Sequence, residues 1–150
     1  GGVSTTPAGM ATTIWEETHW SRYTPVHSIQ KRHLVRPQIT CGTHALALAL
    51  AANLRPGDEL LSPVGKPYDT LEEVIGIRPS KGSLAEYGIT YRQVELLEDG
   101  YFDYPAIREA INERTKLVTI QRSKGYQTRP SYSVEKIGEL IALSRRSSRM

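Results

Sequence analysis

The stretch Arg36–Leu54, RPQITCGTHALALALAANL, decides the fold class of this chain. Its pattern predicts a short strand at Pro37–Thr40, a tight turn at Cys41–His44, and then a helix rich in Ala and Leu. Such a unit presents free backbone N–H groups at the positive end of the helix dipole, which is a ready site for a phosphate or another dianion. The alternative is purely structural: Gly42 makes the turn and Thr43 caps the helix.

Residues 34–143 alternate strand and helix, the pattern typical of a parallel α/β architecture. Further strands are expected at Glu59–Pro63, Ile89–Leu96 and Lys116–Gln121, and helices at Thr43–Leu54, Pro67–Ile75, Tyr104–Asn112 and after the capping residue Ser133, with loops at Arg78–Gly88 and Lys124–Pro130. The last helix carries an apolar stripe of Val134, Ile137, Leu140 and Ile141. We therefore expect an α/β fold, a partial three-layer sandwich with a mostly parallel sheet and flanking helices.

Three long segments follow the opening stretch in order: PGDELLSPVGKPYDTLEEVIGI, GSLAEYGITYRQVEL and AINERTKLVTIQRSKGYQTRPS. With them, residues 34–143 closely resemble the methionine gamma-lyase-like, aluminium-resistance family of pyridoxal-phosphate (PLP) enzymes. The resemblance implies part of the large PLP-binding domain of an aspartate-aminotransferase-type, PLP-dependent transferase-like fold. It also implies a cytoplasmic, homo-oligomeric parent enzyme, a carbon–sulfur lyase that acts on sulfur amino acids.

The resemblance also assigns site residues. Gly42, Thr43 and His44 match the family's phosphate-binding turn, with the backbone of His44 rather than its ring facing the cofactor phosphate. Tyr68 falls where related enzymes stack an aromatic ring on the pyridine of PLP, although it would also serve as an ordinary tyrosine at the start of a helix.

Gln121, Arg122 and Ser123 close the most strand-like run, and ligand sites in open α/β sheets gather at the carboxyl ends of strands. By resemblance, this is where the family contacts cofactor or substrate. Arg122 suits a bidentate pair with a carboxylate, but a surface salt bridge would explain it equally well.

PLP chemistry needs a lysine that forms a Schiff base, and the resemblance places that lysine downstream of the matched residues. None of Lys31, Lys66, Lys81, Lys116, Lys124 and Lys136 stands in such a context. We assign no catalytic residue and no metal ligand, and we expect this chain to be an inactive fragment. A non-catalytic α/β binding or scaffolding module is the alternative, and a dinucleotide-binding module is weaker because the first turn lacks G-x-G-x-x-G.

The two ends depart from the family pattern. The codons for Met10–Trp20, read one frame over, permit Gly-Tyr-Asp-Asp-Met/Leu-Gly-Arg-Asp-Thr-Leu, a segment that the family has and this chain lacks. Ser144–Met150 likewise permits Lys-Glu-Val-Lys-Gln-Asp in another frame. We interpret residues 1–33 and 144–150 as out-of-frame segments flanking a genuine core, and we expect both to be poorly ordered. A divergent natural terminus is the alternative.

Charge and composition exclude several classes of function. The net charge of +3 comes from the two ends, because residues 34–143 hold 13 basic and 14 acidic side chains. The middle therefore offers no basic face for nucleic acid. No apolar run is long enough to cross a membrane, and the single cysteine, Cys41, fits a reducing cytoplasm.

Overall fold

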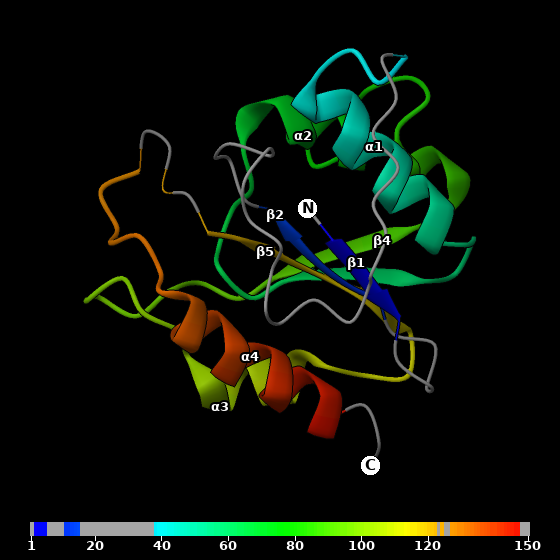
Figure 1. Cartoon of the computed structure of the whole chain (residues 1–150). Helices are drawn as coiled ribbons and strands as arrows, with labels where there is room; N and C mark the ends of the chain where they lie inside the picture. The colour runs from blue at the N-terminus through cyan, green and yellow to red at the C-terminus, as the bar shows by residue number, and fades with distance from the viewer. Residues whose placement is uncertain (1, 6–10, 16–37, 123, 125–126, 148–150) are drawn as a thin grey trace.

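The computed structural model describes residues 2–5, 11–15, 38–122, 124 and 127–147. Within this part of the chain the strands are β1 (Gly2–Thr5), β2 (Ala11–Trp15), β3 (Glu59–Ser62), β4 (Thr90–Gln93) and β5 (Thr115–Gln121). The helices are α1 (Gly42–Asn53), α2 (Asp69–Ile75), the 3₁₀ helix η1 (Leu84–Tyr87), α3 (Tyr104–Ala110) and α4 (Val134–Ser147). Figure 1 shows α1 and α2 on one face of the sheet and α3 and α4 on the other. The expected α/β sandwich is confirmed.

The strands form one sheet in the order β1-β2-β5-β3-β4. Strands β2, β5, β3 and β4 run parallel, and β1 pairs antiparallel with β2. The predicted strand at Pro37–Thr40 is wrong over its described part, because Gln38 lies in a turn and Ile39 and Thr40 are irregular. The sheet position on the outer side of β5 is taken by β2, and the N–H and hydroxyl of Thr40 instead lie against His44 Nδ1, a local side-chain contact that competes with strand pairing.

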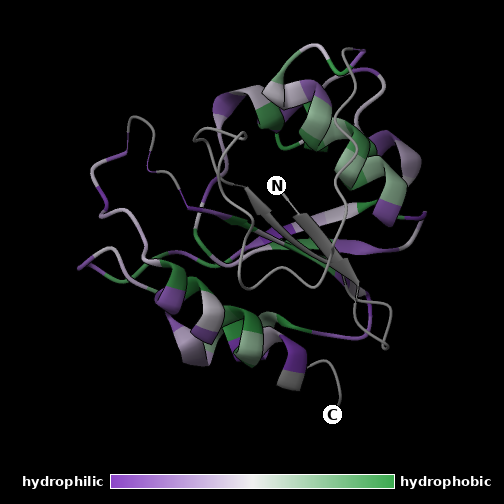
Figure 2. Cartoon of the chain, in the orientation of Figure 1, coloured by the Kyte–Doolittle hydropathy of each residue, from purple (hydrophilic) through white to green (hydrophobic). Residues whose placement is uncertain are grey.

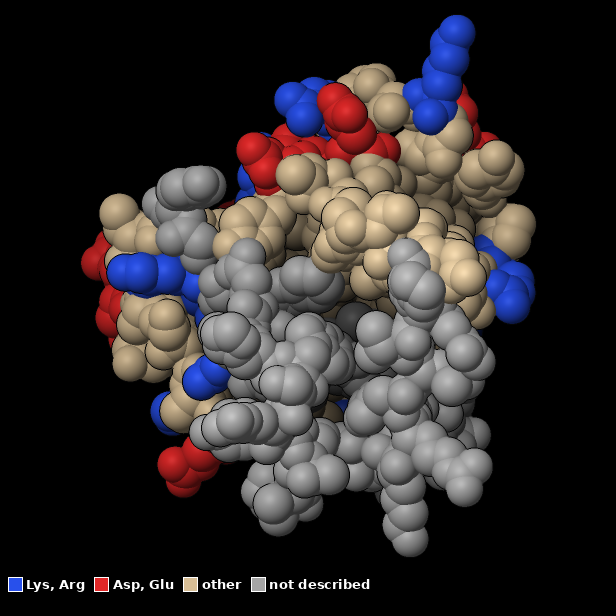
Figure 3. Space-filling model, turned by 45° about the horizontal axis from the view of Figure 1, so that its top comes forward, with Lys and Arg blue, Asp and Glu red and all other residues tan. Residues whose placement is uncertain are grey.

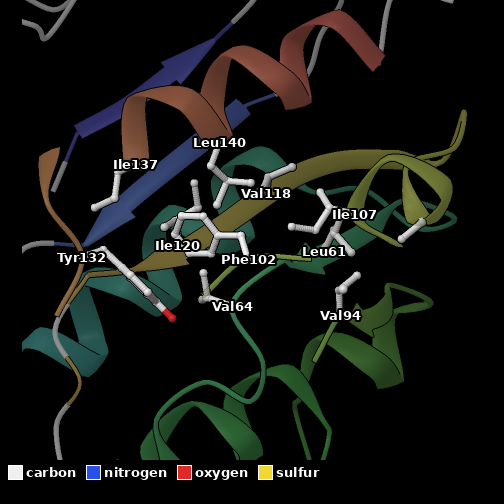
Figure 4. Packing of buried hydrophobic residues seen from close by; sticks show 11 residues of the cluster. Leu61, Val64, Val94, Phe102, Ile107, Val118, Ile120, Tyr132, Ile137 and Leu140 are labelled. Atoms are coloured by element: carbon white, nitrogen blue, oxygen red, sulfur yellow. The ribbon is translucent and has the colours of Figure 1, made fainter. Parts of the chain in front are cut away.

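Alternation along β3 and β5 sends neighbouring side chains to opposite faces of the sheet. Leu60 and Leu117 are fully buried in a cluster with the apolar residues of α1 and α2. Leu61 and Val118, one position further along each strand, pack instead with residues of α3 and α4. Figure 4 shows this second cluster, in which the labelled side chains of both strands meet those of the helices. Two apolar faces explain why a parallel sheet needs helices on both sides.

Local signals explain where several helices begin and end. The carboxylate of Asp103 accepts the Ala106 N–H at 3.0 Å and begins α3. Gly76, with φ of 95°, ends α2 in the left-handed conformation. The hydroxyl of Ser133 accepts the Lys136 N–H at 3.2 Å, which confirms the predicted cap of α4.

The apolar stripe predicted on α4 is confirmed at three of its four positions. Ile137 and Leu140 are buried, and Ile141 packs against the same cluster. Val134 was expected in the stripe but is 55% exposed. It stands at the first position of the helix, ahead of the turn that contacts the sheet.

Helix α1 is apolar around most of its circumference, as its colouring in Figure 2 shows. Leu46 and Leu50 are buried against the sheet, whereas Leu48 is 48% exposed. In Figure 3, where the top of the molecule comes forward, uncharged side chains form much of the described surface, and charged groups lie at its upper, left and right edges.

Parts of both flanking segments adopt regular structure. Strands β1 and β2 fall within residues 1–33, and the last turn of α4 continues to Ser147, with Ser144 fully buried. The expectation that residues 1–33 and 144–150 are poorly ordered stays a prediction. The out-of-frame interpretation itself stays a prediction.

Candidate functional site at the carboxyl edge of the sheet

The predicted site residues that the structure describes lie toward one edge of the sheet. The end of α1 leads through Leu54–Asp58 directly into the start of β3. A helix of 12 residues is about 18 Å long, comparable to the sheet's width along the strands. The start of α1 therefore lies toward the carboxyl ends of β3 and β5, where ligands bind in open α/β sheets.

The turn before α1 leaves backbone donors open. Cys41 is extended and acts as the N-cap, its thiol accepting the His44 N–H at 3.4 Å, while its carbonyl accepts the Ala45 N–H. The capping role considered for Thr43 is therefore wrong, because Thr43 lies inside the first turn. Among the described residues, no protein group accepts a hydrogen bond from the N–H of Gly42 or Thr43.

The imidazole of His44 folds back on the residues before the helix. Its Nδ1 lies 3.4 Å from the Thr40 backbone N and 3.5 Å from the Thr40 hydroxyl. The ring thus stabilises the turn locally. That the backbone of His44 faces a ligand stays a prediction. A bound anion would compete for that N–H with the Cys41 thiol, a weak acceptor.

Tyr68 and Gln121 meet although 53 residues separate them. The side-chain Oε1 of Gln121 accepts the Tyr68 backbone N–H at 3.3 Å. Gln121 is 8% exposed at the end of β5, and Tyr68 is half-buried directly before α2. Because the side chain of Gln121 shares a face with Leu117, it projects toward the α1 and α2 layer.

Arg122, directly after β5, contacts a different part of the molecule from Gln121. Its Nε donates to the carbonyl of Tyr132 at 3.1 Å, and Tyr132 belongs to the cluster on the α3 and α4 face. The side chains of Gln121 and Arg122 therefore make their contacts on opposite faces of the sheet. The third predicted residue, Ser123, lies outside the described residues.

Sequence reasoning missed two residues of the loop that follows β5. Arg129 is 7% exposed, and its guanidinium donates to the Gln121 carbonyl at 2.9 Å. Gln127 donates through Nε2 to the Lys66 carbonyl at 3.2 Å. Burial lowers the pKa of Arg129 from its ordinary value. No local pattern in the sequence predicts that the guanidinium of Arg129 is buried.

A buried carboxylate stands at the opposite, amino edge. Glu59 is 2% exposed and accepts from Asn112 Nδ2 at 2.8 Å, Thr115 Oγ1 at 2.9 Å and Arg92 Nε at 3.2 Å. These donors join β3, β4 and β5 where the strands begin. Its place, away from the carboxyl ends, indicates a structural role.

The described residues contain no group of three or more His, Cys, Asp or Glu side chains placed to hold a metal ion. Within the same residues, no helix has the length and apolar character that a bilayer crossing needs.

A helix start with open backbone N–H groups and a polar pair lie toward the carboxyl edge of a parallel sheet, the place where α/β domains commonly bind ligands. The chain belongs to the methionine gamma-lyase family, since the model of that family, described as methionine gamma-lyase, matches residues 21–149. The uncharacterized protein YnbB of Bacillus subtilis (strain 168) is 56% identical over 110 residues, which are 72% of this chain and 26% of YnbB.

Solved structures agree with this assignment. A candidate cystathionine beta-lyase involved in aluminum resistance from Listeria innocua has a TM-score of 0.74 and 52% identity, covering 75% of this chain and 28% of that one. A carbon-sulfur lyase involved in aluminum resistance from Clostridium novyi NT has a TM-score of 0.73 and 43% identity, covering 77% and 28%. The chain thus spans about a quarter of the length of the relatives that it matches.

Proposed function

We propose that this chain is the phosphate- and ring-binding part of a PLP-dependent carbon–sulfur lyase that acts on sulfur amino acids. The observation that carries the proposal is the geometry of the carboxyl edge. In a member of the methionine gamma-lyase family, open N–H groups at the start of α1 share that edge with the Tyr68–Gln121 pair. The proposal extends to a cytoplasmic location and a homo-oligomeric parent, and the single cysteine supports the former.

The residues of the turn fit the phosphate of the cofactor. The N–H groups of Gly42 and Thr43 have no acceptor within the described part of the chain, and the dipole of a 12-residue helix favours negative charge there. The Thr43 hydroxyl adds a donor in the same turn. These groups would bind the phosphate and orient it.

The ring of Tyr68 would cover one face of the pyridine. Stacked aromatic rings contribute about 1 kcal/mol beyond the area that they bury. The hydrogen bond from Tyr68 N–H to Gln121 fixes the backbone that carries this ring. The bound cofactor would supply an electron sink for the carbanion at the α-carbon of the substrate.

We propose further that the chain alone is inactive. Of its lysines, Lys66 pairs with Glu72 at 2.9 Å and Lys136 with Glu139 at 3.2 Å, and both ion pairs would have to break before the amine could attack an aldehyde. Release of a thiol from a sulfur amino acid by the chain mixed with PLP would contradict this part of the proposal.

The test of the binding role uses pyridoxine 5′-phosphate, which keeps the ring and phosphate but forms no imine with lysine. Gly42→Pro removes one N–H donor at the first helical position, where proline is tolerated. Cys41 before it already has φ of −159° and ψ of 171°, which suits a residue preceding proline. Gly42→Ala keeps the N–H and is the matched control.

Titration calorimetry should show Gly42→Pro weakening the affinity by about 10- to 100-fold, because a hydrogen bond to a charged group contributes about 1.5–3 kcal/mol. Gly42→Ala should bind like the parent sequence. Tyr68→Leu should also weaken binding, whereas Tyr87→Leu, at a tyrosine that is 62% exposed on η1, should not. Equal affinities for Gly42→Pro and Gly42→Ala would refute the role of the turn.

A non-catalytic binding or scaffolding module is the second candidate, and the exposed Leu48 on the apolar helix α1 favours it. No measurable binding of pyridoxine 5′-phosphate by the parent sequence would support this candidate over the first.

A further inference from the structure

We propose that Arg129 is a positioning residue that holds Tyr68 in place through two glutamines. The inference rests on the proposed function in one respect, which is the role of Tyr68 as the residue that covers the cofactor ring. The contacts themselves do not depend on it.

The guanidinium of Arg129 caps the carboxyl end of β5. Its Nη2 donates to the Gln121 carbonyl at 2.9 Å, and its Nη1 donates to the carbonyls of Arg122 at 3.4 Å and Pro130 at 3.0 Å. The strand ends at Gln121, so the carbonyls there need donors from outside the ladder. A planar fork of N–H groups can serve several of them at once, as a lysine ammonium cannot.

The first link to Tyr68 runs through Gln121. Arg129 binds the main-chain carbonyl of Gln121, and the side-chain Oε1 of the same residue accepts the Tyr68 N–H at 3.3 Å. Fixing the end of the strand therefore fixes the origin of the side chain that reaches Tyr68.

The second link runs through Gln127. Arg129 Nε donates to Gln127 Oε1 at 2.8 Å, which leaves the amide nitrogen of Gln127 to donate to the Lys66 carbonyl at 3.2 Å. Lys66 stands two residues before Tyr68. One guanidinium thus binds two glutamines, Gln121 through its main-chain carbonyl and Gln127 through its amide oxygen. Both glutamines form a hydrogen bond with the Lys66–Tyr68 segment.

Arg129 is itself held by a rigid aromatic group. Its Cζ lies 4.4 Å from the centre of the Tyr132 ring, and Tyr132 is 1% exposed and packs against Phe102 with ring centres 4.5 Å apart. The Tyr132 hydroxyl donates to the Gly100 carbonyl at 3.0 Å. Figure 4 shows Phe102 and Tyr132 among the side chains of this cluster. Arg129 thus connects the core on the α3 and α4 face to Tyr68, which stands directly before α2 in the opposite helix layer.

Amide hydrogen exchange of the full chain, followed by NMR, tests the connection without any ligand. Arg129→Met should speed exchange of the Tyr68 amide at least tenfold. The Thr90 amide, which donates to the Asp58 carbonyl at 2.9 Å near the opposite edge, should keep its rate. Gln127→Met removes one link and should give a smaller increase, and Arg129→Lys should not restore the parent rate. Equal acceleration at Tyr68 and Thr90 would show a global stabilising role and overturn the proposal.

Binding of pyridoxine 5′-phosphate then separates this proposal from the previous one. Arg129→Met should weaken binding in the parent sequence but not in a Tyr68→Leu background, and inorganic phosphate affinity should stay unchanged. If Tyr68→Leu weakens binding while Arg129→Met changes neither exchange nor affinity, the positioning role fails and the cofactor role stands. If Arg129→Met frees the Tyr68 amide while Tyr68→Leu leaves binding unchanged, the positioning role stands and the cofactor role of Tyr68 fails.

Discussion

Two glycines with the same backbone geometry differ in what surrounds them. Gly100 has φ of +80° and Gly82 has φ of +77°, a region in which residues with a Cβ are strained. A Cβ added at Gly82 would meet nothing within 4 Å. A Cβ added at Gly100 would lie 2.7 Å from Pro130 Cδ and 3.2 Å from Arg129 Cβ. Comparing Gly100→Ala with Gly82→Ala therefore isolates the packing of the 98–101 turn on the Arg129 loop.

The magnitudes follow from these surroundings. Gly82→Ala should lower the free energy of unfolding by the backbone strain alone, about 1–2 kcal/mol. Gly100→Ala adds overpacking, about 1–3 kcal/mol more, because a proline ring cannot rotate away as a flexible side-chain end can. The extra loss corresponds to roughly 2–12 °C in the melting temperature of a domain of this size.

Urea unfolding followed by far-UV circular dichroism measures both variants on the same scale. The midpoint for Gly100→Ala should fall clearly below that for Gly82→Ala, with similar slopes. Indistinguishable midpoints would refute the close packing of this turn on Arg129 and Pro130. They would also remove the support that the turn gives to Arg129.

Two further predictions concern buried polar groups. Glu59→Gln keeps the shape of the side chain but turns an NH₂ group toward the donors of Asn112 or Arg92, so urea unfolding should show a loss of about 2–4 kcal/mol in the free energy of unfolding. The control Glu73→Gln breaks only an exposed ion pair and should cost less than about 1 kcal/mol. Equal losses for the two variants would contradict the buried network around Glu59. Burial raises the pKa of Tyr91 above its ordinary value of 10.0, so the folded state favours the neutral phenol. The resulting contribution to stability is complete below pH 10 and is lost as the pH rises above that value. Urea midpoints measured from pH 9 to 11.5 should therefore fall less steeply for Tyr91→Phe than for the parent sequence, by at most about 1.4 kcal/mol per pH unit, and parallel profiles would argue against this burial.

The sequence by itself determined the class of fold and most of its elements. Apolar runs, caps and glycines placed β3, β5 and the helices to within a few residues, because periodicity and capping act over short distances along the chain. The Asp103 and Ser133 caps, for example, depend on groups only three residues apart. The resemblance to the family also predicted Tyr68 and Gln121 as site residues, and their role in binding stays a prediction.

Only the tertiary structure decided how those residues are used. Tyr68 and Gln121 touch across 53 residues, and Gln127 reaches Lys66 across 61, distances in sequence at which no local pattern carries information. The same holds for the place of β2 beside β5, and for the contacts that Gln121 and Arg122 make on opposite faces of the sheet. Burial of Arg129 depends on loops brought together by the sheet, because a guanidinium leaves water only where folding supplies enough acceptors at once.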